Sequence, residues 1–76
     1  MPKLPRVTAR QALQALQRAG WYQQRQRGSH LVLKHPDKPA ARVTLPMHAG
    51  ETLYPKTLLS ILEQAQLTVD QFRELM

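Results

Sequence analysis

Three short strand-like segments separated by tight turns lie between two helical patterns, and this order constrains the fold more than any other feature of the sequence. The first turn is Gly28-Ser29 and the second is the Pro-Asp-Lys-Pro segment at 36–39. Connections this short join antiparallel neighbours, because parallel strands need a crossover of a dozen or more residues. We therefore predict a three-stranded antiparallel sheet, with strands over residues 21–27, 30–35 and 41–45.

Helical patterns flank these strands in the sequence. Thr8 and Gln11 form a T-x-x-Q capping box, and apolar residues then recur at three- and four-residue spacing until Gly20 stops the helix. A second helix is expected to begin at Pro55, and another T-x-x-Q box at 68–71 precedes a short terminal helix. The order α-β-β-β-α with a short C-terminal helix predicts an α+β fold, a two-layer sandwich with helices on one side of the sheet.

The length of the chain allows one domain with a small core. Chains of 76 residues rarely hold two cores, and they hide only about 60% of the surface that their unfolded form exposes. We therefore treat residues 1–76 as a single domain, with residues 1–7 as an extended lead-in and residues 47–52 as a loop. Because such a domain is marginally stable, we expect a partner or an oligomer to support it.

The residue types and motifs that are missing exclude several classes of protein. The sequence has no cysteine, so it has neither a disulfide framework nor a thiolate zinc site, which fits the cytoplasm. No apolar run reaches the roughly 18 residues of a membrane span, and the N-terminus lacks the apolar core of a signal peptide. Gly-rich phosphate-binding motifs and G-x-S-x-G turns are also missing, which argues against nucleotide-driven and acyl-transfer chemistry. We expect no cofactor and no association with membranes.

Charge is distributed unevenly along the chain. Eleven Lys and Arg residues face five Asp and Glu residues, a net charge of +6. Nine of the eleven cations fall within residues 1–42, where Asp37 is the only acid, whereas residues 43–76 hold two cations and four acids. This asymmetry is typical of a protein that binds a polyanion, and it places the contact on the first half of the chain.

The three histidines are the first candidates for acid–base chemistry near neutral pH. His30 follows the Gly28-Ser29 turn directly, where backbone N–H groups can approach a phosphate closely, although a histidine in this position is more often a plain surface residue. His35 is expected to be a solvated turn residue, and His48 a loop residue that can reach across to the hairpin. The H-x4-H spacing without cysteine or a nearby carboxylate disfavours a metal site.

Basic residues surround the turn, and antiparallel pairing brings many of them onto neighbouring strands. We predict phosphate contacts from the turn residues Gly28 and Ser29 and from a set of basic side chains, namely Arg25, Arg27, Lys34, Lys38 and Arg42. The alternative is a cationic face that serves solubility, but Asp37 is the only nearby acid to balance it. Trp21 is expected to pack in the core, and Tyr22 is a candidate for stacking on bases.

Several short motifs, taken jointly, resemble the HicA family of mRNA interferase toxins. They are Gly28-Ser29-His30, Lys-His-Pro at 34–36, Pro-Met-His at 46–48 and Leu-Ser-Ile-Leu-Glu-Gln-Ala at 59–65. The resemblance runs from about Thr8 to Phe72, nearly the whole chain. Two positions depart from the family pattern: Gln66 stands where members commonly have Gly, which alters a helix end, and Leu59 stands where many have a basic residue.

This resemblance implies a fold like that of the double-stranded-RNA-binding domain, ribosome-independent cleavage of mRNA, and inhibition by a HicB-type antitoxin. It also implies that His30, the histidine of the Gly-Ser-His motif, is the catalytic residue. RNA carries its own nucleophile, the 2′-OH, so His30 needs only to move a proton, and His48 is the candidate for the complementary transfer. We expect the antitoxin to cover His30 and oligomers to form through the antitoxin complex.

The sequence leaves two other functions open. The same fold commonly binds RNA by shape and phosphate contact with no chemistry, so a non-catalytic RNA-binding module is the main alternative. A protein-interaction adaptor is the second, and tight binding to an acidic protein without salt-sensitive RNA affinity would identify it. Substitution of His30 separates an enzyme from a binder, because only an enzyme would lose cleavage.

Overall fold

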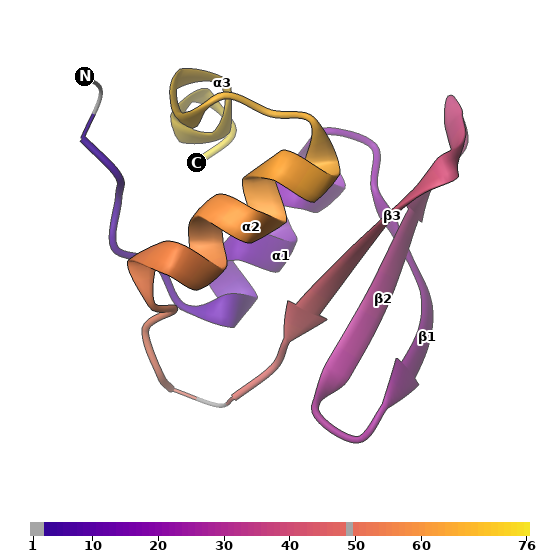
Figure 1. The fold of residues 1–76 in the computed structure, drawn as a ribbon, viewed down its shortest axis with the longest axis horizontal. Coiled ribbons are helices and arrows are strands. Elements are labelled where there is room, and N and C mark those ends of the chain that lie inside the picture. The colour runs from indigo at the N-terminus through magenta and orange to yellow at the C-terminus, as the bar shows by residue number, and fades with distance from the viewer. Residues whose placement is uncertain (1–2, 49) are drawn as a thin grey trace.

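The computed structural model describes residues 3–48 and 50–76 and contains the elements in the predicted order (Figure 1). Met1 and Pro2 of the predicted lead-in and Ala49 of the predicted loop lie outside the described residues. The α+β class and the antiparallel sheet are confirmed. The elements are α1 (Ala9–Arg18), β1 (Tyr22–Arg27), β2 (His30–His35), β3 (Lys38–Pro46), α2 (Pro55–Ala65) and α3 (Val69–Glu74).

The three strands form an antiparallel sheet with β2 in the centre. Leu31 and Leu33 of β2 are buried, and in register they stand opposite Leu45 and Val43 of β3, which are buried as well. Every residue of β1, in contrast, is exposed. Because side chains alternate along a strand, these buried residues mark one face of the sheet as the core face. The helices lie on that side of the sheet (Figure 1).

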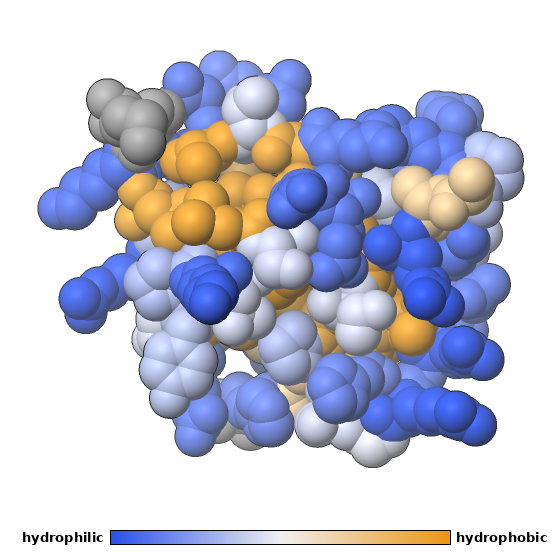
Figure 2. Space-filling view, viewed as in Figure 1, coloured by the Kyte–Doolittle hydropathy of each residue, from blue (hydrophilic) through white to orange (hydrophobic). Residues whose placement is uncertain are grey.

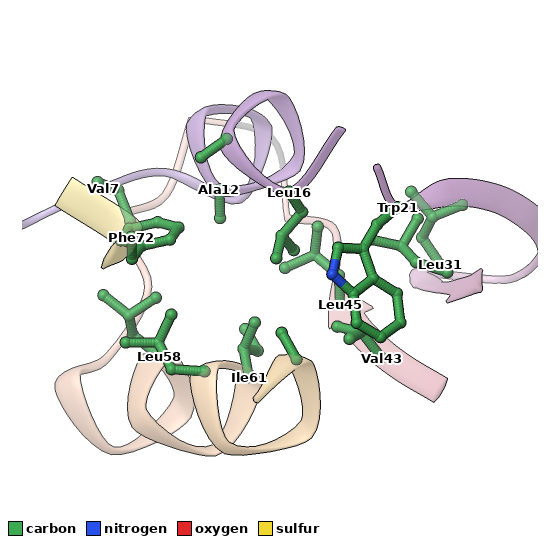
Figure 3. Close-up of a cluster of buried hydrophobic side chains, with 14 residues drawn as sticks. Val7, Ala12, Leu16, Trp21, Leu31, Val43, Leu45, Leu58, Ile61 and Phe72 are labelled. Atoms are coloured by element: carbon green, nitrogen blue, oxygen red, sulfur yellow. The ribbon is translucent and has the colours of Figure 1, made fainter. Parts of the chain in front are cut away.

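The hydrophobic core lies between the sheet and the helices (Figure 3). Trp21 contributes to it from the sheet side, Leu16 from α1 and Ile61 from α2, and each is at most 3% exposed. Phe72 of α3 and Val7 of the lead-in close the far end of the core. The predicted packing role of Trp21 is confirmed.

The lead-in before α1 is docked onto the domain. The Leu53 N–H donates to the Val7 carbonyl oxygen at 2.8 Å, and Thr8 forms an isolated antiparallel bridge with Thr52. These bonds hold the segment before α1 against the segment before α2. The lead-in therefore contributes to the core, which its composition alone did not indicate.

Strand β3 begins at Lys38, three residues earlier than predicted, so the turn is only Pro36-Asp37. The register jumps between the pair Leu33–Val43 and the pair His35–Lys38, which leaves an irregular segment at the start of β3. The sequence predicted Pro39 as the last residue of a Pro-Asp-Lys-Pro turn. An edge strand tolerates proline, however, and β3 is an edge strand.

Both long helices end in the same hydrogen-bond pattern. At the end of α1 the Trp21 N–H donates to the Leu16 oxygen, and Gly20 has a φ of 102°. At the end of α2 the Leu67 N–H donates to the Leu62 oxygen, and Gln66 has a φ of 60°. This is the Schellman arrangement, in which a left-handed residue, usually glycine, follows the helix. Here α2 ends in this way without a glycine.

Hydrophilic and apolar side chains are unevenly distributed over the surface. Hydrophilic side chains cover most of the face seen in Figure 2, and apolar surface gathers where α2, α3 and the lead-in meet. None of the helices in the described part of the chain has the length and apolarity that crossing a membrane requires.

Candidate functional site

His30 is exposed and lies on the face of the sheet that the helices leave uncovered, which we call the open face. It is the first residue of β2 and directly follows the Gly28-Ser29 turn, where Gly28 has a φ of 54°. Leu31 and Leu33 point into the core, so the alternation of side chains directs His30 and Lys34 to the other side. The sequence alone did not determine this orientation.

Three of the predicted basic residues accompany His30 on the open face. Arg27 stands opposite His30 in register, and Arg25 stands opposite Val32, two residues further along β2. Directly opposed residues share a face, with their Cβ atoms about 5 Å apart. Arg42 precedes the buried Val43 and is exposed, so alternation places it on this face too. Arg27 and Arg25 are thus the cations nearest to His30, and Arg42 lies further along the open face, four residues before the partner of His30.

The remaining predicted cations are placed differently. Lys34 lies on the open face, but its Nζ also donates to the Pro39 carbonyl oxygen at 2.8 Å and so ties β2 to the start of β3. Lys38 stands opposite His35, at the end of β2 that is remote from His30. Lys34 therefore shares the open face with His30 but lies four residues away along β2. Lys38 is not close to His30. Tyr22, opposite Lys34, is a half-exposed aromatic ring on the open face.

The loop that carries His48 is attached to the turn that carries His30. The Met47 N–H donates to the Ser29 carbonyl oxygen at 2.6 Å, and Pro46 stands opposite His30 in register. His48 is exposed and follows Pro46 by two residues. The 28–30 and 46–48 motifs, which are distant in sequence, thus meet at one end of the sheet.

His35 has a structural environment, and the prediction of a solvated turn residue is wrong. Its Nδ1 accepts the Asp37 N–H at 3.1 Å, so the hydrogen is on Nε2, which donates to the Ala19 carbonyl oxygen at 2.9 Å. The ring also contacts Trp21 edge-on, with centroids 5.2 Å apart. A Cβ at Gly20 would lie 2.5 Å from Nε2, so this histidine needs a glycine beside it. His35 therefore links the end of α1 to the β2–β3 turn.

A comparison with protein families agrees with this arrangement. The family model described as the HicA toxin of bacterial toxin–antitoxin systems matches residues 9–67, well over half of the chain. The chain belongs to the HicA toxin family. The matched range includes the whole sheet, the 28–30 turn and α2. No curated protein sequence matches the chain as a relative. Membership of this family implies an antitoxin partner for the protein.

Two features of this HicA toxin were not found by sequence reasoning. One hollow lies at Pro46 and His48, beside the partner of His30, and a second lies between Thr44 of β3 and α2; the exposed Tyr54 lines both. The available signal was an aromatic residue directly before the proline that opens α2, at a position where the helical pattern requires no apolar side chain. Among the described residues, no group of three or more His, Cys, Asp or Glu side chains is placed to bind a metal ion.

Proposed function

We propose that this HicA toxin is an endoribonuclease that cleaves mRNA, with His30 as its catalytic residue. The observation that supports this most directly is the position of His30 at the start of β2, exposed on the open face and opposite Arg27. Within the described residues its imidazole has no hydrogen-bond partner, in contrast to that of His35. An imidazole on a residue whose backbone is held in a strand, with both ring nitrogens available, is suited to proton transfer with a ligand.

The chemistry needs no nucleophile from the protein. A base removes the proton of the 2′-OH, the 2′-oxygen attacks the adjacent phosphorus, and the bond from phosphorus to the 5′-oxygen breaks as that oxygen receives a proton. His30 acts as the base or as the acid, and His48, on the loop joined to the same turn, is the candidate for the other transfer. The products are a 2′,3′-cyclic phosphate and a 5′-hydroxyl.

The cations of the open face stabilise the charge that develops on phosphorus and hold the RNA backbone. Arg27 and Arg25 provide this charge nearest to His30, and Arg42 and Lys34 lie further along the sheet on the same face. The backbone of Gly28 and the hydroxyl of Ser29 contribute donors at the turn. Lys38 of β3 stands opposite His35, at the far end of β2 from His30, so it does not belong to the same phosphate site. We assign it at most a peripheral contact.

We further propose that the antitoxin partner is a HicB-type protein whose acidic surface covers His30, and that oligomers form through this complex. A cationic face with an exposed catalytic turn is readily blocked by a partner of complementary charge. A structure of the complex that left His30 open to solvent would contradict this mode of inhibition.

The function is tested by the cleavage of labelled single-stranded RNA in EDTA by the wild type and by His30→Ala and His48→Ala variants of matched folding. We expect the wild type to cut and His30→Ala to be inactive, with the loss for a single acid or base about 10²- to 10⁴-fold. Full activity of His48→Ala would exclude the two-histidine mechanism. If no variant cut RNA, the wild type included, and all bound it in a salt-dependent way, the protein would be a binding module instead.

A further inference from the structure

Tyr54 is the most exposed large hydrophobic residue in the described part of the chain, with 79% of its surface accessible. The other three, Tyr22, Leu59 and Met76, are about half exposed at 50–51%. A single exposed aromatic ring is common on protein surfaces and indicates little by itself. Tyr54 differs from such residues in how its backbone is held and in what surrounds the ring.

The backbone at Tyr54 is anchored on both sides. On one side, the preceding residue, Leu53, is bonded to the Val7 oxygen at 2.8 Å. On the other, Pro55 opens α2, and the Leu58 N–H donates to the Tyr54 oxygen at 2.9 Å. Proline also holds the residue before it in an extended conformation, and Tyr54 has a ψ of 144°. The side chain makes no capping hydrogen bond, so a rigid backbone presents a free ring to solvent.

The ring stands between two hollows, one of which reaches the His30 site. The first, of about 160 Å³, is lined by Pro46, His48 and Tyr54 among others, and Pro46 is the register partner of His30. The second is a groove of about 720 Å³ that runs along α2 beside Thr44 of β3. Tyr54 and Thr57 line both hollows. The first hollow therefore begins at the strand end that pairs with His30, and the groove adjoins this hollow at Tyr54 and Thr57.

The groove has the mixed lining that a nucleotide requires. Its walls include the apolar Pro55 and Ile61, the hydroxyls of Thr57 and Ser60, and the cation of Lys56. Apolar walls suit the faces of bases, hydroxyls can bond to their edges, and an ammonium group can contact a phosphate. Glu51, which lines the first hollow, is the one acid in the lining of either hollow. Lys56 and Glu51 offset one another, so binding here depends on the aromatic ring and the apolar and hydroxyl lining, while the cations of the open face hold the rest of the RNA backbone.

We propose that Tyr54 stacks on a base of the single-stranded RNA that runs from His30 into this groove. The inference rests on the proposed ribonuclease function and adds to it a binding residue and a preference for unpaired RNA. A base must leave its duplex to stack on a protein side chain, so the ring selects single strands without reading their sequence. Leu59, an exposed apolar residue of α2 that lines neither hollow, serves as a control.

The experiment measures the affinity of the non-cleaving His30→Ala protein for a single-stranded RNA oligomer containing 2-aminopurine, whose fluorescence falls when the base stacks. Adding Tyr54→Ala should weaken binding about 10-fold and abolish the fluorescence change, as expected for the loss of one stacked base. Tyr54→Phe should restore both, since the ring is retained. Leu59→Ala should change the affinity less than about 3-fold, and double-stranded RNA should bind Tyr54→Ala and its parent alike. Because Tyr54 is exposed, thermal melts of all these proteins should coincide.

The outcomes separate this inference from the proposed function. If the wild type never cut RNA but Tyr54→Ala lost the stacking signal, the ribonuclease function would be refuted and base stacking on Tyr54 would be supported. Equal affinity and equal fluorescence change in Tyr54→Ala and its parent would refute base stacking on Tyr54 without affecting the proposed ribonuclease function. If Tyr54→Ala kept its RNA affinity but lost binding to the antitoxin, the groove would be a protein docking site, and the inference would be wrong.

Discussion

The two ends of β2 carry the same residue type in opposite surroundings. His30, at the start of the strand, is exposed on the open face beside Arg27 and has no hydrogen-bond partner within the described residues. His35, at the other end, is partly buried on the core face, contacts Trp21 and uses both ring nitrogens in hydrogen bonds. The two positions are five apart, an odd number, so the alternation of a strand places them on opposite faces.

This contrast shows that the surroundings of a histidine, and not its presence in a motif, determine what it can do. The imidazole of His35 is engaged by Asp37 and Ala19 and is not available to a ligand. The imidazole of His30 is held only through its backbone. The structure therefore separates a stabilising histidine from a candidate catalyst on one six-residue strand.

The largest expected effect is on activity at the His30 end. His30→Gln should lower the rate of RNA cleavage by about 10²- to 10⁴-fold. The free energy of unfolding should change by less than about 0.5 kcal/mol, since the side chain is exposed and unbonded. Cleavage assays and urea denaturation of the same preparation measure the two quantities. A large loss of stability would show that His30 has a structural role and would remove the contrast with His35.

The next effect is on stability at the His35 end. Gly20→Ala should destabilise the protein by about 2 to 3 kcal/mol, because it adds backbone strain at positive φ and displaces the His35 ring from Ala19. Urea denaturation gives the free energy, and the cleavage rate of the folded protein should stay near that of the wild type. A cleavage loss as large as that of His30→Gln would contradict the separation of the two ends.

His35→Ala should cost about 1 to 2 kcal/mol, the loss of two hydrogen bonds and of the packing on Trp21. The sharper measurement is a double-mutant cycle with Gly20→Ala. Once His35 is removed, the new methyl group has no ring to displace, so Gly20→Ala should cost less than in the wild type. Strictly additive effects would show that the two positions are not coupled.

The smallest effect tests the other helix end, which lacks a histidine neighbour. Gln66→Gly should stabilise the protein by about 0.5 to 1 kcal/mol, because glycine adopts the observed φ of 60° without strain. Gln66→Ala is the matched control, because it removes the side chain and keeps the strain, and it should leave stability nearly unchanged. Thermal unfolding measures both. No gain from glycine would mean that the Gln66 side chain makes a compensating interaction.

Much of the fold was predictable from the sequence because the determining signals are local. The capping boxes at Thr8 and Thr68 are both present with reciprocal hydrogen bonds, and α2 begins at the proline expected to open it. A cap or a tight turn involves residues three or four apart, so its chemistry can be read directly from the chain. The early start of β3 was missed because only its place at the edge of the sheet makes Pro39 acceptable there.

The candidate site was predictable only in part. The Gly28-Ser29-His30 turn and the basic residues of β1 were identified from the sequence, and their opposition across the hairpin follows from the short turn. The separation of Lys38 from this group was not, because it depends on the irregular register between β2 and β3. Tyr54 was missed because the hollows around it are formed by the β3 end, the following loop and α2 together.

The sequence by itself determined the order of the elements, the positions of most of their ends and the excess of positive charge in the first half of the chain. These properties depend on neighbours along the chain, on residue type and on period. Only the tertiary structure decided that His30 faces outward, that His35 is partly buried and links α1 to the β2–β3 turn, and that Tyr54 is exposed beside a groove. Each of these depends on which face of the sheet the helices cover, because a side chain becomes available or unavailable only when elements distant in sequence pack against it.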